Sequence, residues 1–211
     1  MKTYQGVLYD IDGTLLNTIN MNMYPLIRII KEELGEDWAL KDVIKFMAYP
    51  GMKTMEELGI QNPQQVYRRW VRYVNEYEEG ATPYEGVEQV LDALQAQGVR
   101  QAAVSSKNRA QYHIDMVGNG LDRYMETAVL EEDTTLHKPN PAPLLECLKR
   151  LGLTTDQALY VGDTPSDAQA AQSAGMDFAY AKWNGVEQGR ADSAAYVLYT
   201  PGQLLELFES R

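Results

Sequence analysis

Short runs of apolar, β-branched and aromatic residues recur along the chain and alternate with stretches of helical spacing. The clearest runs predict strands at residues 5–10, 100–105 and 157–162, and weaker ones predict strands at 126–130, 176–181 and 195–199. Apolar positions three and four residues apart predict helices near residues 87–98, 109–117, 141–151, 165–174 and 201–209. Strands that alternate with helices are typical of a parallel sheet with crossover helices, so the pattern predicts an α/β fold.

The interval from residue 17 to 81 has a different pattern, because its spacing is helical and it holds no convincing strand. Its helices are expected to break near Gly35, at Pro50–Gly51 and between Gly59 and Pro63. We therefore expect two domains, which are an α/β core of residues 1–16 and 82–211 and a helical insert of residues 17–81.

Composition and charge exclude several classes of protein. The net charge of −11 over 211 residues argues against a nucleic-acid partner, because phosphate contacts need Lys and Arg. The single cysteine, Cys147, excludes an internal disulfide, fits a reducing compartment and is expected to be a small buried side chain of a helix. No apolar run approaches the roughly 18 residues of a membrane span, and the start MKTYQGVLYD lacks the apolar region of a signal peptide. We expect a cytoplasmic protein.

Polar residues follow the ends of the predicted strands. Ligands of open parallel sheets bind at the carboxyl ends of the strands, so residues in these positions are expected to converge on one edge. The segments are YDIDGTLLNT after the first strand, SSK after the second, HKPNPAP before a helix and VGDTPSD after the third. They contribute Asp10, Asp12, Ser105, Ser106, Lys107, Lys138, Asp163 and Asp167.

The chemistry of this set points to a cation and a phosphate. Several carboxylates on one edge repel each other and need a compensating positive charge. Oxygen ligands without His or Cys favour Mg²⁺ over zinc or copper. A hydroxyl and an ammonium group suit a phosphate, and a carboxylate can itself act as the nucleophile that forms an aspartyl-phosphate.

The four segments, in this order and spacing, resemble the motifs of the haloacid-dehalogenase-like hydrolase superfamily. The match is to its phosphoglycolate-phosphatase-like branch, which has a helical cap inserted after the first motif. The resemblance implies a Rossmann-like core with an inserted cap domain and a Mg²⁺-dependent phosphatase activity on a small phosphate ester.

The resemblance also implies a role for each residue. Asp10 would be the nucleophile and a metal ligand, and Asp12 would be the general acid and base, with its backbone carbonyl on the metal. Asp163 would complete the metal site, and Asp167 would orient the metal's water or Lys138. Ser105 and Lys138 would bind the phosphoryl group, with Ser106 as a neighbouring candidate and Lys107 as a peripheral residue.

Other functions of this superfamily stay open. Asp12 argues against dehalogenases and phosphonate hydrolases, which lack a carboxylate at that position. A sugar-phosphate mutase, a pyrophosphatase and a catalytically idle binding module remain alternatives. The expected partner is a small phosphorylated metabolite, which could be phosphoglycolate, pyrophosphate, a nucleoside monophosphate or a sugar phosphate. Neither a nucleic acid nor a membrane is expected, and the protein is expected to be a monomer or a weak homodimer.

Substrate specificity is expected to come from the inserted domain, because the core motifs contact only the shared phosphoryl group. Within it, the segment MAYPGMKTM (residues 47–55) is the expected specificity loop. Pro50–Gly51 interrupts the helical pattern there and leaves Tyr49 and Lys53 available for a polar or anionic group. A plain turn with a solvated lysine is the alternative interpretation.

Overall fold

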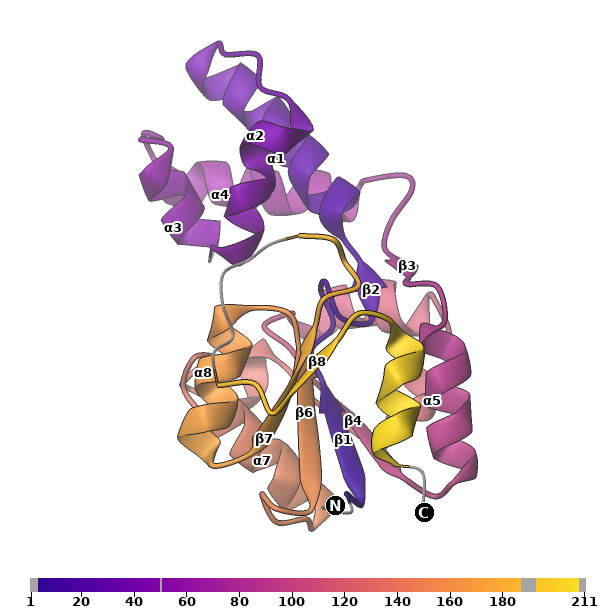
Figure 1. Ribbon diagram of the computed structural model, residues 1–211. Coiled ribbons are helices and arrows are strands. Elements are labelled where there is room, and N and C mark those ends of the chain that lie inside the picture. Colours follow the sequence, from indigo (N-terminus) through magenta and orange to yellow (C-terminus); the bar gives the residue numbers. More distant parts are fainter. Residues whose placement is uncertain (1–3, 50, 187–192, 209–211) are drawn as a thin grey trace. The chain divides into compact units, whose positions relative to one another are not determined.

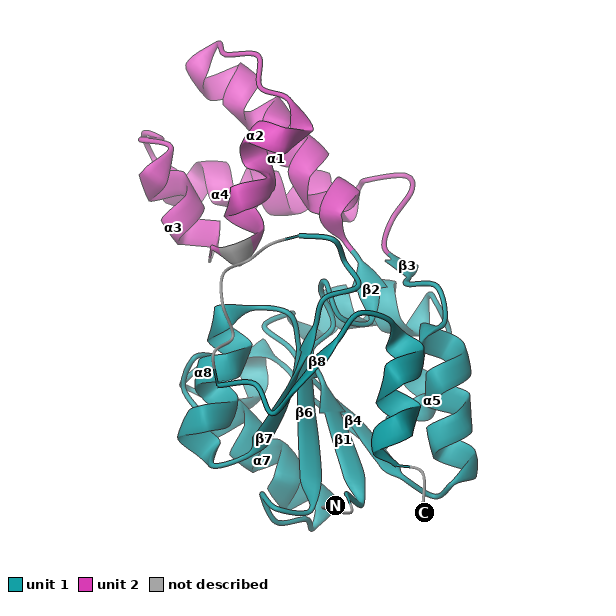
Figure 2. Cartoon of the chain, in the orientation of Figure 1, with its two compact units in different colours: residues 1–17, 82–211 teal, residues 18–81 magenta. Residues whose placement is uncertain are grey.

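A computed structural model of the protein describes residues 4–49, 51–186 and 193–208. Its contacts divide the chain into two compact units (Figure 2). Unit 1 consists of residues 1–17 and 82–211, and unit 2 consists of residues 18–81. The helical insert is therefore a compact unit, and each unit is described here by itself.

Unit 1 is built on a six-stranded sheet whose strands all run parallel. The order is β5-β4-β1-β6-β7-β8, so the first strand of the chain lies in the middle (Figure 1). The predicted α/β fold is thereby confirmed, with each predicted strand present. The strands are β1 (Gly6–Tyr9), β4 (Arg100–Val104), β5 (Thr127–Val129), β6 (Ala158–Gly162), β7 (Asp177–Ala181) and β8 (Tyr196–Leu198).

Helices pack on both faces of this sheet (Figure 1). One face carries α5 (Val87–Ala96) and the 3₁₀ segment η5 (Pro201–Leu207), and the other carries α7 (Ala142–Leu151) and α8 (Pro165–Ala174). Because both faces are covered, the central strands are apolar and fully buried, as parallel strands usually are. Cys147 is buried between α7 and the sheet, as the sequence predicted.

Three features of unit 1 differ from the prediction. The helix expected at 201–209 is the 3₁₀ segment η5. The expected helix at 109–117 is α6 (Arg109–Tyr112) followed by a π-helical turn, η2 (His113–Val117). The chain also forms a two-stranded antiparallel ribbon, β2 (Leu16–Asn17) with β3 (Thr82–Pro83), where it leaves and re-enters unit 1. Such short pairings carry no hydrophobic periodicity, so the sequence gives no signal for them. Short 3₁₀ turns complete the unit at η3 (Asp122–Tyr124) and η4 (Glu131–Asp133).

Every regular element in the described part of unit 2 is a helix, and short turns join these helices, which confirms the predicted pattern. Its interior is held by apolar side chains and by a hydrogen bond from the Trp70 indole to the Asn22 carbonyl, 3.0 Å long. Pro50, one of the predicted breaks, lies outside the described residues. The helical segments are α1 (Ile19–Leu34), α2 (Leu40–Val43), η1 (Ile44–Ala48), α3 (Gly51–Glu57) and α4 (Pro63–Asn75). Neither unit contains, in its described part, a helix long and apolar enough to cross a membrane.

Candidate active site

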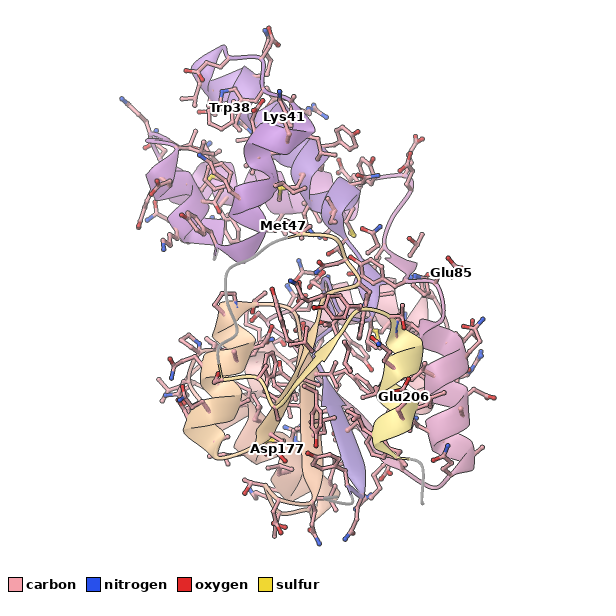
Figure 3. All side chains as sticks on the ribbon, viewed as in Figure 1. Trp38, Lys41, Met47, Glu85, Asp177 and Glu206 are labelled. Carbon is pink, nitrogen blue, oxygen red and sulfur yellow. The ribbon has the colours of Figure 1, made fainter. Side chains whose placement is uncertain are left out.

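The pairing register of the sheet aligns the carboxyl ends of β1, β4 and β6, so the residues that follow these strands lie beside each other. Tyr9 of β1 pairs with Ala103 of β4 and with Val161 of β6. Asp10 therefore follows β1 beside the ends of both neighbouring strands, and its amide donates to the Val161 carbonyl at 2.9 Å. Asp177, labelled in Figure 3, is the first residue of β7 and so lies at the amino ends of the strands, opposite the carboxyl ends.

A tight turn after β1 brings the first motif against the last. Gly13 has φ +79°, a conformation that favours glycine. A Cβ atom at this position would lie 2.1 Å from Oδ2 of Asp163, so only glycine fits. The next side chain, Thr14, donates a hydrogen bond to Asp163 Oδ1 at 3.2 Å. The Gly-Thr pair of the first motif therefore holds the carboxylate that follows β6.

Lys138 joins three segments that lie far apart in the sequence. Its ammonium group donates to Asp10 Oδ1 and to Asp167 Oδ1, both at 2.7 Å. It also contacts the hydroxyl of Tyr160 at 3.1 Å and the carbonyl of Val104, at the end of β4, at 3.5 Å. The side chain is only 8% exposed. Burial opposes its charge, but the two carboxylates outweigh that effect and raise the pKa of Lys138 well above its usual value.

Asp167 is tied to Lys138 and to its own helix N-terminus. Oδ1 also accepts from the Tyr160 hydroxyl at 2.7 Å, and Oδ2 accepts from the backbone amide and the hydroxyl of Thr164 at 3.1 and 2.6 Å. Burial opposes ionisation, but Lys138 and these hydrogen bonds hold the pKa of Asp167 below its usual value. Gly162 permits this packing, since a Cβ there would lie 2.7 Å from Asp167 Cβ.

Three buried carboxylates form a potential cation site. Asp10, Asp163 and Asp167 each place one oxygen within 4.8 Å of the others. Burial raises the pKa of Asp10 to about 7, although Lys138 opposes the effect, and burial also raises the pKa of Asp163 well above its usual value. Lys138 supplies one positive charge against three carboxylates. A divalent cation would bring the total charge of these four side chains and the ion to zero.

The segment after β4 corrects one expectation. Lys107 was expected to be peripheral, but it is buried, and its ammonium lies 3.0 Å from Asp12 Oδ1 and 2.6 Å from Asp115 Oδ2. Residue spacing could not show this, because Asp115 is brought inward by the π-helical turn. Of the two serines, Ser105 is buried and its Oγ accepts from the Lys107 amide at 3.2 Å, whereas Ser106 is exposed. The two serine candidates therefore differ in burial, and a phosphate contact of Ser105 or Ser106 stays a prediction.

Comparisons with known proteins agree with this geometry. The family model described as "Haloacid dehalogenase-like hydrolase" matches residues 7–181, which include every residue placed at the site so far. The chain belongs to this hydrolase family. "Putative pyrophosphatase PpaX" of Caldanaerobacter subterraneus subsp. tengcongensis is 29% identical over 207 residues, which cover 97% of this chain and 94% of the relative. "Pyrophosphatase PpaX" of Bacillus velezensis is 26% identical over 98% and 97% of the two chains.

A solved structure of the haloacid dehalogenase-like type shows the same fold. The protein from Lactobacillus plantarum described as a "putative phosphoglycolate phosphatase" superposes with a TM-score of 0.88 and 27% identity. The match covers 98% of this chain and all of that one. The expected superfamily and the expected branch are therefore confirmed.

This hydrolase site contains two further residues that the motifs did not reveal. Asn184, after β7, donates to Asp163 Oδ2 at 2.7 Å and to the Gly13 carbonyl at 3.1 Å. Tyr160 donates to Asp167 from the middle of β6. A tyrosine within an apolar strand was a usable signal, because a buried phenol needs a hydrogen-bond partner. Asn184 lies in an ordinary turn sequence, KWNG, which gives no comparable signal.

Tyr49 and Lys53, the two residues named for the expected specificity loop, lie in unit 2, and Lys53 is on helix α3 instead of in a loop. The ammonium of Lys53 lies 4.4 Å from the centre of the Tyr49 ring, and that ring packs edge-on against Phe46. Lys53 is exposed, and Tyr49 is partly buried. These two side chains are therefore in contact with each other, in a cation–π arrangement, on the surface of the helical unit.

Proposed function

We propose that this hydrolase is a Mg²⁺-dependent phosphatase that acts on a small phosphorylated compound through an aspartyl-phosphate on Asp10. The observation that carries the proposal is the buried group of three carboxylates and one ammonium at the carboxyl edge of the sheet. Such a group can balance a divalent cation, and the cation and the ammonium can face the phosphoryl oxygens. In phosphoryl transfer such charge neutralisation and positioning supply most of the catalysis.

The residues fit a magnesium ion. Their donor set consists of carboxylate oxygens without His or Cys, which Mg²⁺ prefers. Asp10 and Asp163 would be the ligands, together with the backbone carbonyl of Asp12. Asp167 is less suited to direct ligation, because its two oxygens accept four hydrogen bonds, one of them from the Lys138 ammonium. Its role would be to orient Lys138. A bound Mg²⁺ would neutralise charge on the carboxylates and on the phosphoryl oxygens.

The reaction then divides into two displacements. A carboxylate oxygen of Asp10 attacks phosphorus while the bond to the leaving oxygen breaks, and Asp12 gives that oxygen its proton. Lys138 and Ser105 hold the phosphoryl oxygens in place. In the second step Asp12 takes a proton from water, the water oxygen bonds to phosphorus, and the bond to Asp10 breaks. Free phosphate leaves, and both aspartates return to their starting states.

The test is hydrolysis of p-nitrophenyl phosphate with Mg²⁺ and with excess EDTA. Activity should require the metal, and Asp10→Asn should reduce kcat by at least about 10³-fold, because the amide is not a nucleophile. Asp177→Asn is the matched control, since that carboxylate lies at the amino ends of the strands, away from the proposed site. Activity of Asp10→Asn within a few-fold of the wild type would refute the covalent mechanism.

Pyrophosphate is a second candidate substrate beside a phosphate ester such as phosphoglycolate. The relatives from Caldanaerobacter and Bacillus carry the name pyrophosphatase, while the similar structure from Lactobacillus carries the name phosphoglycolate phosphatase. A panel of pyrophosphate, phosphoglycolate, a nucleoside monophosphate and a sugar phosphate, compared by kcat/KM, distinguishes them. The substrate with the highest kcat/KM identifies the class.

We propose further that unit 2 is a cap domain that sets substrate specificity, with Tyr49 and Lys53 as its substrate-contacting residues. The support is chemical, since an exposed ammonium beside an aromatic ring suits a polar or anionic group. The core residues cannot discriminate between esters, because they contact the phosphoryl group that all candidates share. An inserted domain can supply this discrimination and can exclude water.

A further inference from the structure

Lys107 forms a second buried cluster of charges, separate from the one around Lys138. Its ammonium lies between Asp12 of the first motif and Asp115 of the π-helical turn η2. We propose that Lys107, anchored by Asp115, is a positioning residue that fixes the carboxylate of Asp12 for proton transfer to the leaving group. This inference rests on the proposed phosphatase function.

Lys107 thus bridges Asp115 and Asp12, and the contact between Lys107 and Asp115 is the buried half of this bridge. The side chains of Lys107 and Asp115 are 9% and 4% exposed, and their charged atoms are 2.6 Å apart. A buried ammonium without a partner would be strongly unfavourable, so each of these two groups requires the other. The π-helical turn holds Asp115 in place, since Asn119 donates to its backbone carbonyl from both the amide and the side chain, at 3.2 and 2.8 Å.

The backbone of Lys107 is fixed as well. Its amide donates to Ser105 Oγ, and its carbonyl accepts from the Glu131 amide at 2.9 Å. The following residue, Asn108, caps α6, because its side chain accepts from the Gln111 amide at 2.9 Å. The ammonium therefore projects from a rigid segment that also carries the proposed phosphate contact.

The other half of the bridge is the contact between Lys107 and Asp12, the residue proposed to transfer the proton. Asp12 is 33% exposed at the side chain, and its Oδ1 lies 3.0 Å from the Lys107 ammonium. The contact has the distance of an ion pair but not the angle of a hydrogen bond. The ion pair would thus hold the carboxylate of Asp12 in one orientation.

Substrates that differ in leaving group separate this role from a merely structural one. An alkyl phosphate needs a proton on its leaving oxygen, whereas p-nitrophenol leaves readily as an anion. Lys107→Met should lower kcat for the alkyl phosphate by about 10- to 100-fold, a part of the 10²–10⁴-fold effect of general acids. It should lower kcat for p-nitrophenyl phosphate much less, with little change in either KM. Lys149→Met, at an exposed lysine of α7, is the matched control and should leave the ratio of the two kcat values unchanged.

The effect should act through Asp12. In an Asp12→Asn background the acid is already absent, so adding Lys107→Met should not shift the ratio between the two substrates further. An equal fall for both substrates in Lys107→Met, or a full additional shift in the Asp12→Asn background, would overturn the inference.

Asp115→Asn keeps the inference testable if Lys107→Met does not fold. It retains the ammonium but weakens its anchor, so the ratio should shift in the same direction by a smaller factor. An unchanged ratio in a folded Asp115→Asn protein would also refute the positioning role. Wild-type protein that hydrolyses neither substrate with Mg²⁺ would instead refute the phosphatase function itself.

Discussion

Burial of Asp10 beside two other carboxylates predicts a stability that depends on pH and on magnesium. In the metal-free protein, burial and the neighbouring carboxylates raise the pKa of Asp10 to about 7, against an ordinary value of 3.8. Below its ordinary pKa the carboxyl is protonated in both the folded and the unfolded protein. As the pH rises toward 7, the unfolded chain loses this proton first, so the folded protein binds more protons than the unfolded chain.

The sign and size of the effect follow from this difference. Stability falls as the pH rises through the window from about 4 to about 7, and the loss is complete above it. At 1.36 kcal/mol for each pH unit of the window, Asp10 alone lowers the free energy of unfolding by roughly 4 kcal/mol. The raised pKa of Asp163 acts in the same direction. The stabilising contribution of Asp167, whose pKa is lowered, is lost only at more acidic pH and does not enter this window.

The measurement is urea unfolding between about pH 5 and pH 8 in EDTA, for the wild type and for Asp10→Asn. Asparagine does not titrate, so the difference in slope between the two proteins reports Asp10 together with its effect on the pKa of Asp163. Asp10→Asn should lose less stability with rising pH. Adding Mg²⁺ should stabilise the wild type more at pH 8 than at pH 5, because the ion binds the deprotonated carboxylates. Parallel pH profiles for the two proteins in EDTA would refute the reasoning.

Three further predictions concern individual side chains. Asp12→Ala should retain Mg²⁺ affinity and hydrolysis of p-nitrophenyl phosphate but lose about 10²–10⁴-fold in kcat on an alkyl phosphate, and equal losses on both would contradict an acid role. Tyr160→Phe removes a hydrogen bond to Asp167, so urea unfolding should show a loss of about 1 kcal/mol, with Tyr199→Phe, an exposed phenol, as the control. Lys53→Ala and Tyr49→Ala should change the ranking of phosphate esters by kcat/KM, and an unchanged ranking in active variants would exclude this loop.

The fold could be predicted because its determining signals are local. Each buried strand of the parallel sheet is a short apolar run, and each crossover helix has its own periodicity. The ends of those strands then place Asp10, Ser105 and Asp163 near each other through topology alone. Lys138 was identified from its motif, and the structure brings it into contact with Asp10.

The remaining features depend on contacts that no local pattern encodes. Apolar periodicity predicts a regular helix at 109–117, but it does not register the single extra residue of a π turn that directs Asp115 to Lys107. The ribbon of β2 and β3 consists of only two residue pairs, whose members are 65 and 67 positions apart in the sequence. Asn184 reaches Asp163 only because β7 and β6 are neighbours and the chain turns there. Each of these features depends on contacts between segments, and the local sequence at each position carries no signal for them.

Two buried lysines form ion pairs with two separate groups of aspartates. Lys138 contacts Asp10 and Asp167, the proposed nucleophile and its partner, where a bound phosphoryl group and a cation would add further charge. Lys107 contacts Asp12 and Asp115, the proposed acid and its anchor. In the proposed mechanism Asp12 exchanges a proton twice in one turnover, whereas Asp10 attacks as a carboxylate. Separate ammonium groups allow the environment of each aspartate to meet its own requirement, so substitution of one lysine should impair one step more than the other.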